Sequence, residues 1–306
     1  MRERAGEAGG TKETGEIDLF FSACYTDSML NERGVVGMSP IDRKALKARS
    51  KELIRGVQPA IWSVTLIYLL ATNWVDNLVG LLSPVTSRLN ELELTMLEAM
   101  SQNDAAALSN AVETSRQIFT STGGYITLLL SVLILLYTLV VRYGFTSYCM
   151  QAVRGQGADH RELFSRFYMA GKIILAEILQ TLITYLGLIA FIAPGVIAYY
   201  CYSMVPYCLL DDPDCSVLKA FRRSREMTRG RKTELFALDL SFLLWVLGGY
   251  VLDYLVTRMV GGLAGGLLGA AAVTAYECFL LPYVQLTGAQ YYEAMRPRPA
   301  ENDGIY

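Results

Sequence analysis

The chain has little charge and few of the residues that soluble enzymes use for chemistry. Only 18% of its 306 residues are Asp, Glu, Lys or Arg, against roughly 25% in a typical soluble domain. It has one histidine, and its six cysteines form no Cys-x-x-Cys pair. No metal-ligand spacing and no paired nucleophile and base can be recognised. We therefore exclude a disulfide-stabilised mini-protein and an ordinary soluble enzyme, and we predict no catalytic residue, metal site or cofactor.

The chain instead contains long stretches of hydrophobic residues without any charge. Hydrophobic residues make up 53% of the chain, and the mean hydropathy is +0.31. Residues 117–141 carry no charge for 25 positions, and residues 178–210 carry none for 33. A helix of about 20 apolar residues crosses a bilayer, where an irregular backbone would leave its polar groups unsatisfied. These stretches predict a membrane protein built from helices.

The longer stretch is too long for one crossing, because 33 helical residues would extend about 50 Å. Ala193-Pro194-Gly195 lies inside it and predicts a tight turn between two helices, since proline suits the start of a helix and not its interior. We expect an all-α, polytopic membrane bundle of about six transmembrane helices. The predicted spans are residues 57–82, 123–141, 172–192, 194–210, 235–256 and 261–290.

Lysine and arginine predict the orientation of these spans. Residues 33–55 hold seven, residues 142–172 hold five and residues 211–233 hold seven, whereas the intervening loops are poor in them. Basic loops remain in the cytoplasm. This alternation predicts that both termini are cytoplasmic and that residues 85–119 form an extracytoplasmic insertion. Within it Leu89, Leu92, Met96 and Met100 recur at steps of three and four residues, which predicts that the insertion is helical.

The two ends of the chain differ from the membrane domain predicted for residues 38–295. Residues 1–37 are polar and rich in Gly and Glu, and we expect a disordered or wrongly assigned N-terminal extension. Residues 296–306 are expected to form a disordered C-terminal tail.

A basic amphipathic helix is predicted after the fourth span. Val217, Ala220, Phe221 and Ser224 share one face, and Gly230 is expected to end the helix. One hypothesis is a site for phosphate head groups or an acidic partner. The alternative is an interfacial helix that fixes orientation and contacts lipid without specificity. The predicted lipid- or partner-binding residues are Lys219, Arg222, Arg223, Arg229 and Arg231.

Three acidic residues fall inside predicted spans. Glu177, Asp239 and Glu277 are costly there, and an ionisable residue within a membrane is a functional hypothesis by default. All three could face one inner vestibule and pair with Lys172, Arg229 or Arg231. The functional interpretation is a proton- or cation-linked cavity, and the alternative is structural pairing.

Glycine marks a third pattern, at the start of the last span. Gly261, Gly265 and Gly269 are four residues apart, a spacing that lets helix backbones approach closely. Such contacts could lie within the bundle or between copies. No phosphate-binding Gly-x-x-x-x-Gly-Lys-Ser/Thr loop is present.

Several of these motifs resemble one known family. Ala193-Pro194-Gly195, Asp212-Pro213 and the pattern Ala-x-x-x-Ser-Arg-x-x-x-x-Gly, which runs from Ala220 through Ser224-Arg225 to Gly230, carry the resemblance. They resemble the integral-membrane family catalogued as domain of unknown function 975, over residues 38–295. A more distant similarity is to the membrane domain of some glycerophosphodiester phosphodiesterases. The resemblance implies a six-span protein of a bacterial plasma membrane, with no established activity.

Taken together, these patterns predict a non-enzymatic membrane protein. Its expected partners are the bilayer, anionic lipid head groups and a membrane protein or second copy, and nucleic acid is not expected. The alternative is a small-solute or ion transporter that uses the intramembrane acids.

Overall fold

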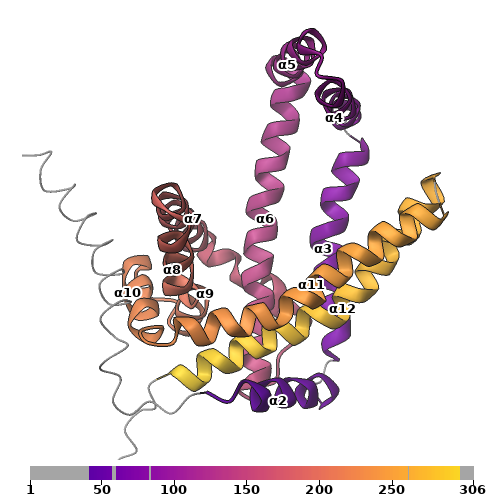
Figure 1. Ribbon diagram of the computed structural model, residues 1–306. Coiled ribbons are helices and arrows are strands. Elements are labelled where there is room, and N and C mark those ends of the chain that lie inside the picture. The colour runs from indigo at the N-terminus through magenta and orange to yellow at the C-terminus, as the bar shows by residue number, and fades with distance from the viewer. Residues whose placement is uncertain (1–40, 57–59, 83, 261, 297–306) are drawn as a thin grey trace, which may run out of the picture.

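The computed structural model describes residues 41–56, 60–82, 84–260 and 262–296, and every regular element in them is a helix (Figure 1). The predicted all-α class is confirmed. The extension at residues 1–37, Gly261 and residues 297–306 lie outside the described residues. The helices are α2 (Arg43–Gly56), α3 (Ile61–Leu82), α4 (Pro84–Gln102), α5 (Ala105–Thr120), α6 (Thr122–Val153), the 3-10 helix η2 (His160–Met169), α7 (Ala170–Ala190), α8 (Ile192–Tyr202), α9 (Val205–Asp211), α10 (Val217–Met227), α11 (Lys232–Val260) and α12 (Gly262–Met295).

Four helical segments in the described part of the chain are long and apolar enough to cross a membrane. They are Thr122–Val153, His160–Ala190, Ile192–Asp211 and Lys232–Val260, and the bent pair of α2 and α3 makes a fifth if it is counted as one span. Only 22% of the most apolar part of α6 is buried within the protein. Apolar surface on this scale needs a cover other than water, which indicates a membrane protein.

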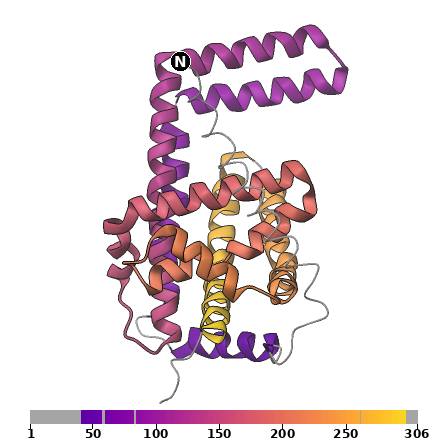
Figure 2. The same cartoon turned by 90° about the vertical axis from the view of Figure 1, so that its left-hand side faces the viewer.

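Helices α3 and α6 stand side by side, and α12 packs against both of them (Figure 1). Helices α4 and α5 form a hairpin that projects at one end of this pair, while α2 lies across the other end (Figures 1 and 2). The turn of the hairpin is local in origin. Asn103 adopts a positive φ of 55°, and the Asp104 carboxylate accepts hydrogen bonds from the N–H groups of Ala106 and Ala107 at the start of α5.

Helix α2 is basic along its length but is held by polar contacts to the last two helices. Ser50 is fully buried, and its hydroxyl lies 3.0 Å from that of Thr287 on α12. The Lys47 ammonium lies 4.2 Å from the centre of the Phe242 ring on α11, a cation–π contact. These contacts bring the N-terminal helix against the C-terminal pair.

Helices α7 and α8 form an antiparallel hairpin, but its turn differs from the prediction. The chain reverses at Phe191, not at Ala193-Pro194-Gly195, and Pro194 is the third residue of α8. The first four N–H groups of a helix have no partner within it, so proline costs little there. Gly195 instead serves the packing: a Cβ atom on Gly187 would come within 2.8 Å of the Gly195 Cα atom.

The hairpin contact predicts that bulk at Gly187 destabilises the protein. Gly187→Val should lower the free energy of unfolding by about 1–3 kcal/mol, the usual cost of forcing extra atoms into a packed contact. Denaturation of the purified protein in detergent micelles would measure it. Gly171→Val in the same helix is the control, because a Cβ atom there meets nothing within 4 Å. Equal effects of the two substitutions would contradict the close approach.

Candidate functional site

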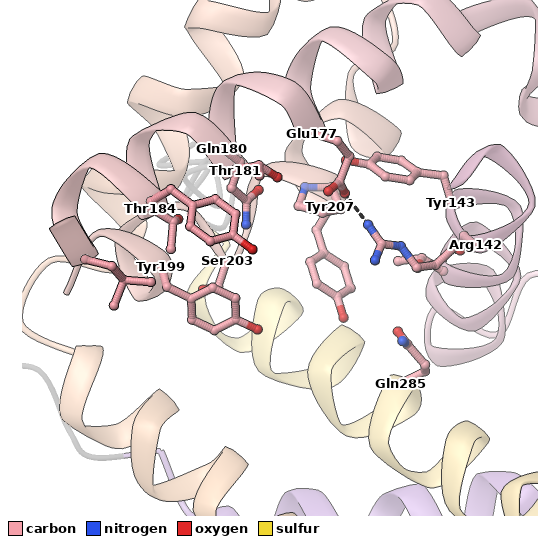
Figure 3. A pocket seen from close by; sticks show the side chains of 14 residues that line it. Arg142, Tyr143, Glu177, Gln180, Thr181, Thr184, Tyr199, Ser203, Tyr207 and Gln285 are labelled. Atoms are coloured by element: carbon pink, nitrogen blue, oxygen red, sulfur yellow. Dashed lines mark hydrogen bonds and ion pairs between the residues drawn. The ribbon is translucent and has the colours of Figure 1, made fainter. Parts of the chain in front are cut away.

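A polar cavity of about 500 Å³ lies between α6 and the hairpin formed by α7, α8 and α9 (Figure 3). Helix α12 closes one side of it through Gln285. Its walls combine an ion pair, hydroxyls and amides with aromatic rings. The lining residues are Arg142, Tyr143, Thr146, Glu177, Gln180, Thr181, Thr184, Tyr185, Leu188, Tyr199, Ser203, Pro206, Tyr207 and Gln285.

The two charged groups of the cavity bind each other. The Arg142 guanidinium donates to the Glu177 carboxylate (Figure 3). The Glu177 side chain is 20% exposed and that of Arg142 is 47% exposed. Arg142 directly follows the uncharged stretch of α6, so the pair lies where the apolar part of that helix ends. Each charge neutralises the other at a depth where a lone charge would be costly.

Helix α7 supplies one polar wall of the cavity. Glu177, Gln180, Thr181 and Thr184 follow steps of three and four residues, which place them on one face of a helix. The Gln180 Oε1 and Thr184 Oγ1 atoms are buried and have no hydrogen-bond partner. Buried polar atoms are normally satisfied. This face therefore offers hydrogen-bonding capacity that the described protein does not use.

The three intramembrane acids do not share this cavity, so the expectation of a common vestibule is wrong. Glu277 on α12 accepts a hydrogen bond of 2.9 Å from the Asn73 amide of α3. Asp239 on α11 is hydrogen-bonded to Tyr200 of α8. Only Glu177 lines the cavity, because α7, α11 and α12 turn these acids toward different neighbours. Lys172, one of the predicted partners, instead donates to the Pro213 carbonyl at 2.6 Å.

The five cations predicted to bind lipid or a partner, on α10 and just after it, do not form one group. Arg222 and Arg229 are exposed at the surface. Lys219 lies 3.6 Å from the Asp212 carboxylate, and Arg231 lies 3.8 Å from the Glu234 carboxylate. Arg223 turns inward to Asp211 at 3.1 Å, so the expectation that it belongs to an outward cationic face is wrong.

Sequence reasoning missed the residue that binds Arg223. The Asp211 side chain is 4% exposed, and three guanidinium groups surround it. Its partners are Arg154 of α6 at 2.7 Å, Arg223 of α10 at 3.1 Å and Arg296 after α12 at 3.3 Å. The Tyr292 hydroxyl of α12 donates at 3.1 Å. We call these five side chains the Asp211 cluster. Asp211 is the first charge after the 33-residue uncharged stretch, which was the available signal.

Charge compensation in this cluster extends to Glu293. Arg154 donates to the Glu293 carboxylate at 2.7 Å as well as to Asp211. Burial opposes the charge of Arg154, but the hydrogen bonds to these two carboxylates outweigh it and raise the guanidinium pKa above its usual value. The cluster is therefore a network of ion pairs that connects the ends of α6, α9 and α12 with α10.

The family pattern around α10 also has a structural explanation. The Cys201 carbonyl belongs to the last turn of α8, which ends at Tyr202. Ser224 and Thr228 of α10 donate to this carbonyl at 2.9 and 3.2 Å. Ala220 is 1% exposed and permits close packing, and Gly230 adopts a φ of 75° that suits glycine. The motif thus attaches α10 to the break in the second arm of the hairpin.

The glycine pattern of α12 is described only in part. Gly265 lies within α12. A Cβ atom on Gly269 would lie 2.7 Å from the Thr257 Oγ1 atom and 2.9 Å from the Asp253 Oδ1 atom, both on α11. This position is therefore a close contact between α11 and α12 within one chain. No group of three or more metal-ligating side chains occurs among the residues with described positions.

Comparison with known proteins gives one match. The family described as "Protein of unknown function (DUF975)" matches residues 38–299, most of the chain. No curated protein matches, and no solved structure matches.

The Asp211 cluster predicts that the adjacent acids Asp211 and Asp212 contribute very differently to the free energy of unfolding. Asp211→Ala should lower the free energy of unfolding by about 3–5 kcal/mol, because it removes the buried carboxylate that three guanidinium groups share. Arg223 then loses its partner, while Arg154 and Arg296 keep Glu293. Asp212→Ala is the control: this side chain is 39% exposed, and its loss should cost less than about 1 kcal/mol. Denaturation in detergent micelles would compare the two variants. A similar small loss in both would contradict the proposed weight of Asp211.

Proposed function

This chain belongs to the family of proteins of unknown function DUF975, and we propose that it binds a small polar solute inside the membrane as a step in moving that solute across. The observation that carries the proposal is the cavity at Arg142 and Glu177, with its unused hydrogen-bonding groups. No covalent step is proposed for the site.

The proposal includes a topology. Six spans result if the α2–α3 pair counts as one crossing and α12 is added to the four apolar segments. The basic loops place both termini in the cytoplasm, with the α4–α5 hairpin on the opposite side of a bacterial plasma membrane. This orientation is supported by α2 and the hairpin lying at opposite ends of α3 (Figure 1). Arg142 then lies near the inner end of the apolar part of α6.

The free-energy cost of placing polar groups within a membrane argues that the cavity holds a ligand. Every polar group placed at membrane depth costs free energy unless it is hydrogen-bonded. A purely structural ion pair would need only Arg142 and Glu177, yet amide and hydroxyl groups from α7, the α8–α9 region and α12 surround the pair. Polar side chains that converge on a cavity from several elements are typical of a small-molecule site.

The α8–α9 region supports movement as well as binding. The second arm of the hairpin is interrupted after Tyr202, and Pro206 lies in the first turn of α9. Ser203 and Pro206 both line the cavity. Interrupted helices near a binding site are common in transporters, and this break lies directly on the cavity wall.

Filling the cavity tests the proposed function. A thermal-shift screen of the purified chain against amino acids, sugars and small carboxylates should find a stabilising solute. Thr184→Phe, which places a ring in the cavity, should abolish that stabilisation and the solute uptake by proteoliposomes. Leu182→Phe is the control, because Leu182 lies on the same helix but is 53% exposed. Stabilisation that survives Thr184→Phe, or no stabilising solute at all, would contradict the proposal.

We also propose the predicted lipid contact as a second candidate, in a narrower form. Leu218 is 71% exposed on α10, and Arg222 is exposed one turn later. An exposed apolar side chain beside exposed cations is typical of a helix at a membrane surface. Arg223 and Arg231 are excluded from this contact because they pair within the chain.

Charge reversal tests the lipid contact without disturbing the Asp211 cluster. Arg222→Glu should reduce retention of phosphatidylglycerol in native mass spectrometry by several-fold, since each basic residue near anionic lipid contributes about 1 kcal/mol and reversal adds repulsion. Arg116→Glu is the control, an arginine with 76% side-chain exposure on α5. Unchanged retention in Arg222→Glu would remove this candidate.

A further inference from the structure

We infer that the cavity selects a zwitterion, a ligand that carries both an ammonium group and a carboxylate or phosphate oxyanion. This inference rests on the proposed function, because it names the chemical class of the solute. It is drawn from the charge balance of the cavity and from the placement of Glu177, Gln180 and Thr184 on α7 opposite Arg142 of α6 (Figure 3).

The charge balance favours a ligand without net charge. The cavity holds one cation, Arg142, and one anion, Glu177, and they neutralise each other. A simple anion that bound Arg142 would leave Glu177 without its partner. A simple cation that bound Glu177 would leave Arg142 without its partner. Leaving one member of such a pair unpaired in a low-dielectric site is strongly unfavourable. A zwitterion replaces the one ion pair by two and leaves no charge alone.

The arrangement of the polar groups in the cavity also favours a zwitterion. On α7, the Glu177 carboxylate is followed by the Gln180 Oε1 and Thr184 Oγ1 atoms, which are buried without partners. The Glu177 and Gln180 oxygens accept hydrogen bonds, and the Thr184 hydroxyl can accept as well as donate. All three lie on one face of one helix. An ammonium group has three donors and no acceptor, so it matches this face. Arg142 lies opposite on α6 (Figure 3), and its planar guanidinium suits a carboxylate or phosphate.

The remaining walls fit a small organic cation. Tyr199 and Tyr207 line the same cavity (Figure 3), and aromatic faces attract ammonium groups. The volume of about 500 Å³ holds an amino acid or a lipid head group but no folded chain. The same chemistry therefore has two sources, a free amino acid and the head group of phosphatidylethanolamine.

Neutralising both charges at once is the decisive experiment. Arg142→Gln with Glu177→Gln removes the ion pair without creating a lone charge, so this double variant is expected to fold. Binding of the amino-acid mixture to the full chain should weaken by more than tenfold, because the variant removes both charges that would pair with the ligand. The control is Glu113→Gln with Arg116→Gln, which neutralises the exposed pair of α5 and should leave binding unchanged.

The comparison ligands separate this inference from the proposed function. Wild-type protein should be stabilised by the amino-acid mixture but not by sugars, acetate or ethylammonium. If sugars bind and neither amino acids nor phosphatidylethanolamine do, the zwitterion inference fails while the proposed solute site stands. If no polar compound and no phosphatidylethanolamine binds at the cavity, both fail. Equal affinity of the double variant and wild type for amino acids would overturn the role of Arg142 and Glu177.

A lipid-retention experiment distinguishes the two sources of the zwitterion. Wild-type protein extracted from vesicles of phosphatidylethanolamine and phosphatidylglycerol should retain the former in native mass spectrometry if the head group is the ligand. That retention should be lost in the double variant of Arg142 and Glu177. Retention of phosphatidylethanolamine that is independent of both residues, together with no binding of amino acids, would overturn the inference.

Discussion

One buried carboxylate holds one end of the helical bundle together. Asp211 binds guanidinium groups from the end of α6, from α10 and from the residue after α12, and the Tyr292 hydroxyl adds a fourth contact. These elements lie far apart along the chain, and their buried side chains also belong to one hydrophobic core, among them Met150, Leu210, Phe221 and Tyr292. Charged hydrogen bonds are short and directional, so this cluster adds directional contacts to that apolar packing.

The cavity and the Asp211 cluster share the short helix α9. Tyr207 lines the cavity, and Asp211 ends the same helix four residues later, a distance of about 6 Å along the axis. Helix α10 reinforces this connection from outside, because Ser224 and Thr228 donate to the Cys201 carbonyl where α8 ends. A displacement of α10 would therefore reach the cavity wall through α8 and α9. Helix α10, which the sequence predicts to contact lipid or a partner, is thus also a structural support for the cavity wall.

Prediction from the sequence succeeded where the signal was local. Uncharged stretches identified the apolar helices, and the spacing of Leu and Met indicated helices within residues 85–119, where the structure has α4 and α5. The position of the hairpin turn was wrong by two to four residues, because proline is tolerated anywhere in the first helical turn. Of the predicted site residues, Glu177 lines the cavity, whereas Asp239 and Glu277 face other helices. Arg142 was missed because it was counted only among the basic residues of a loop. Asp211, which follows an uncharged stretch, was assigned no role.

The sequence by itself determined the helical class, the membrane setting and the asymmetry of basic loops, because these follow from hydropathy and charge along one dimension. Only the tertiary structure decided which charges are partners. Arg142 binds Glu177 across 35 positions, and Arg154 binds Asp211 across 57. The free energy of an ion pair depends on the distance between its two charges and on the burial of both. Both quantities are set by how helices cross, and periodicity within one helix contains no information about that crossing.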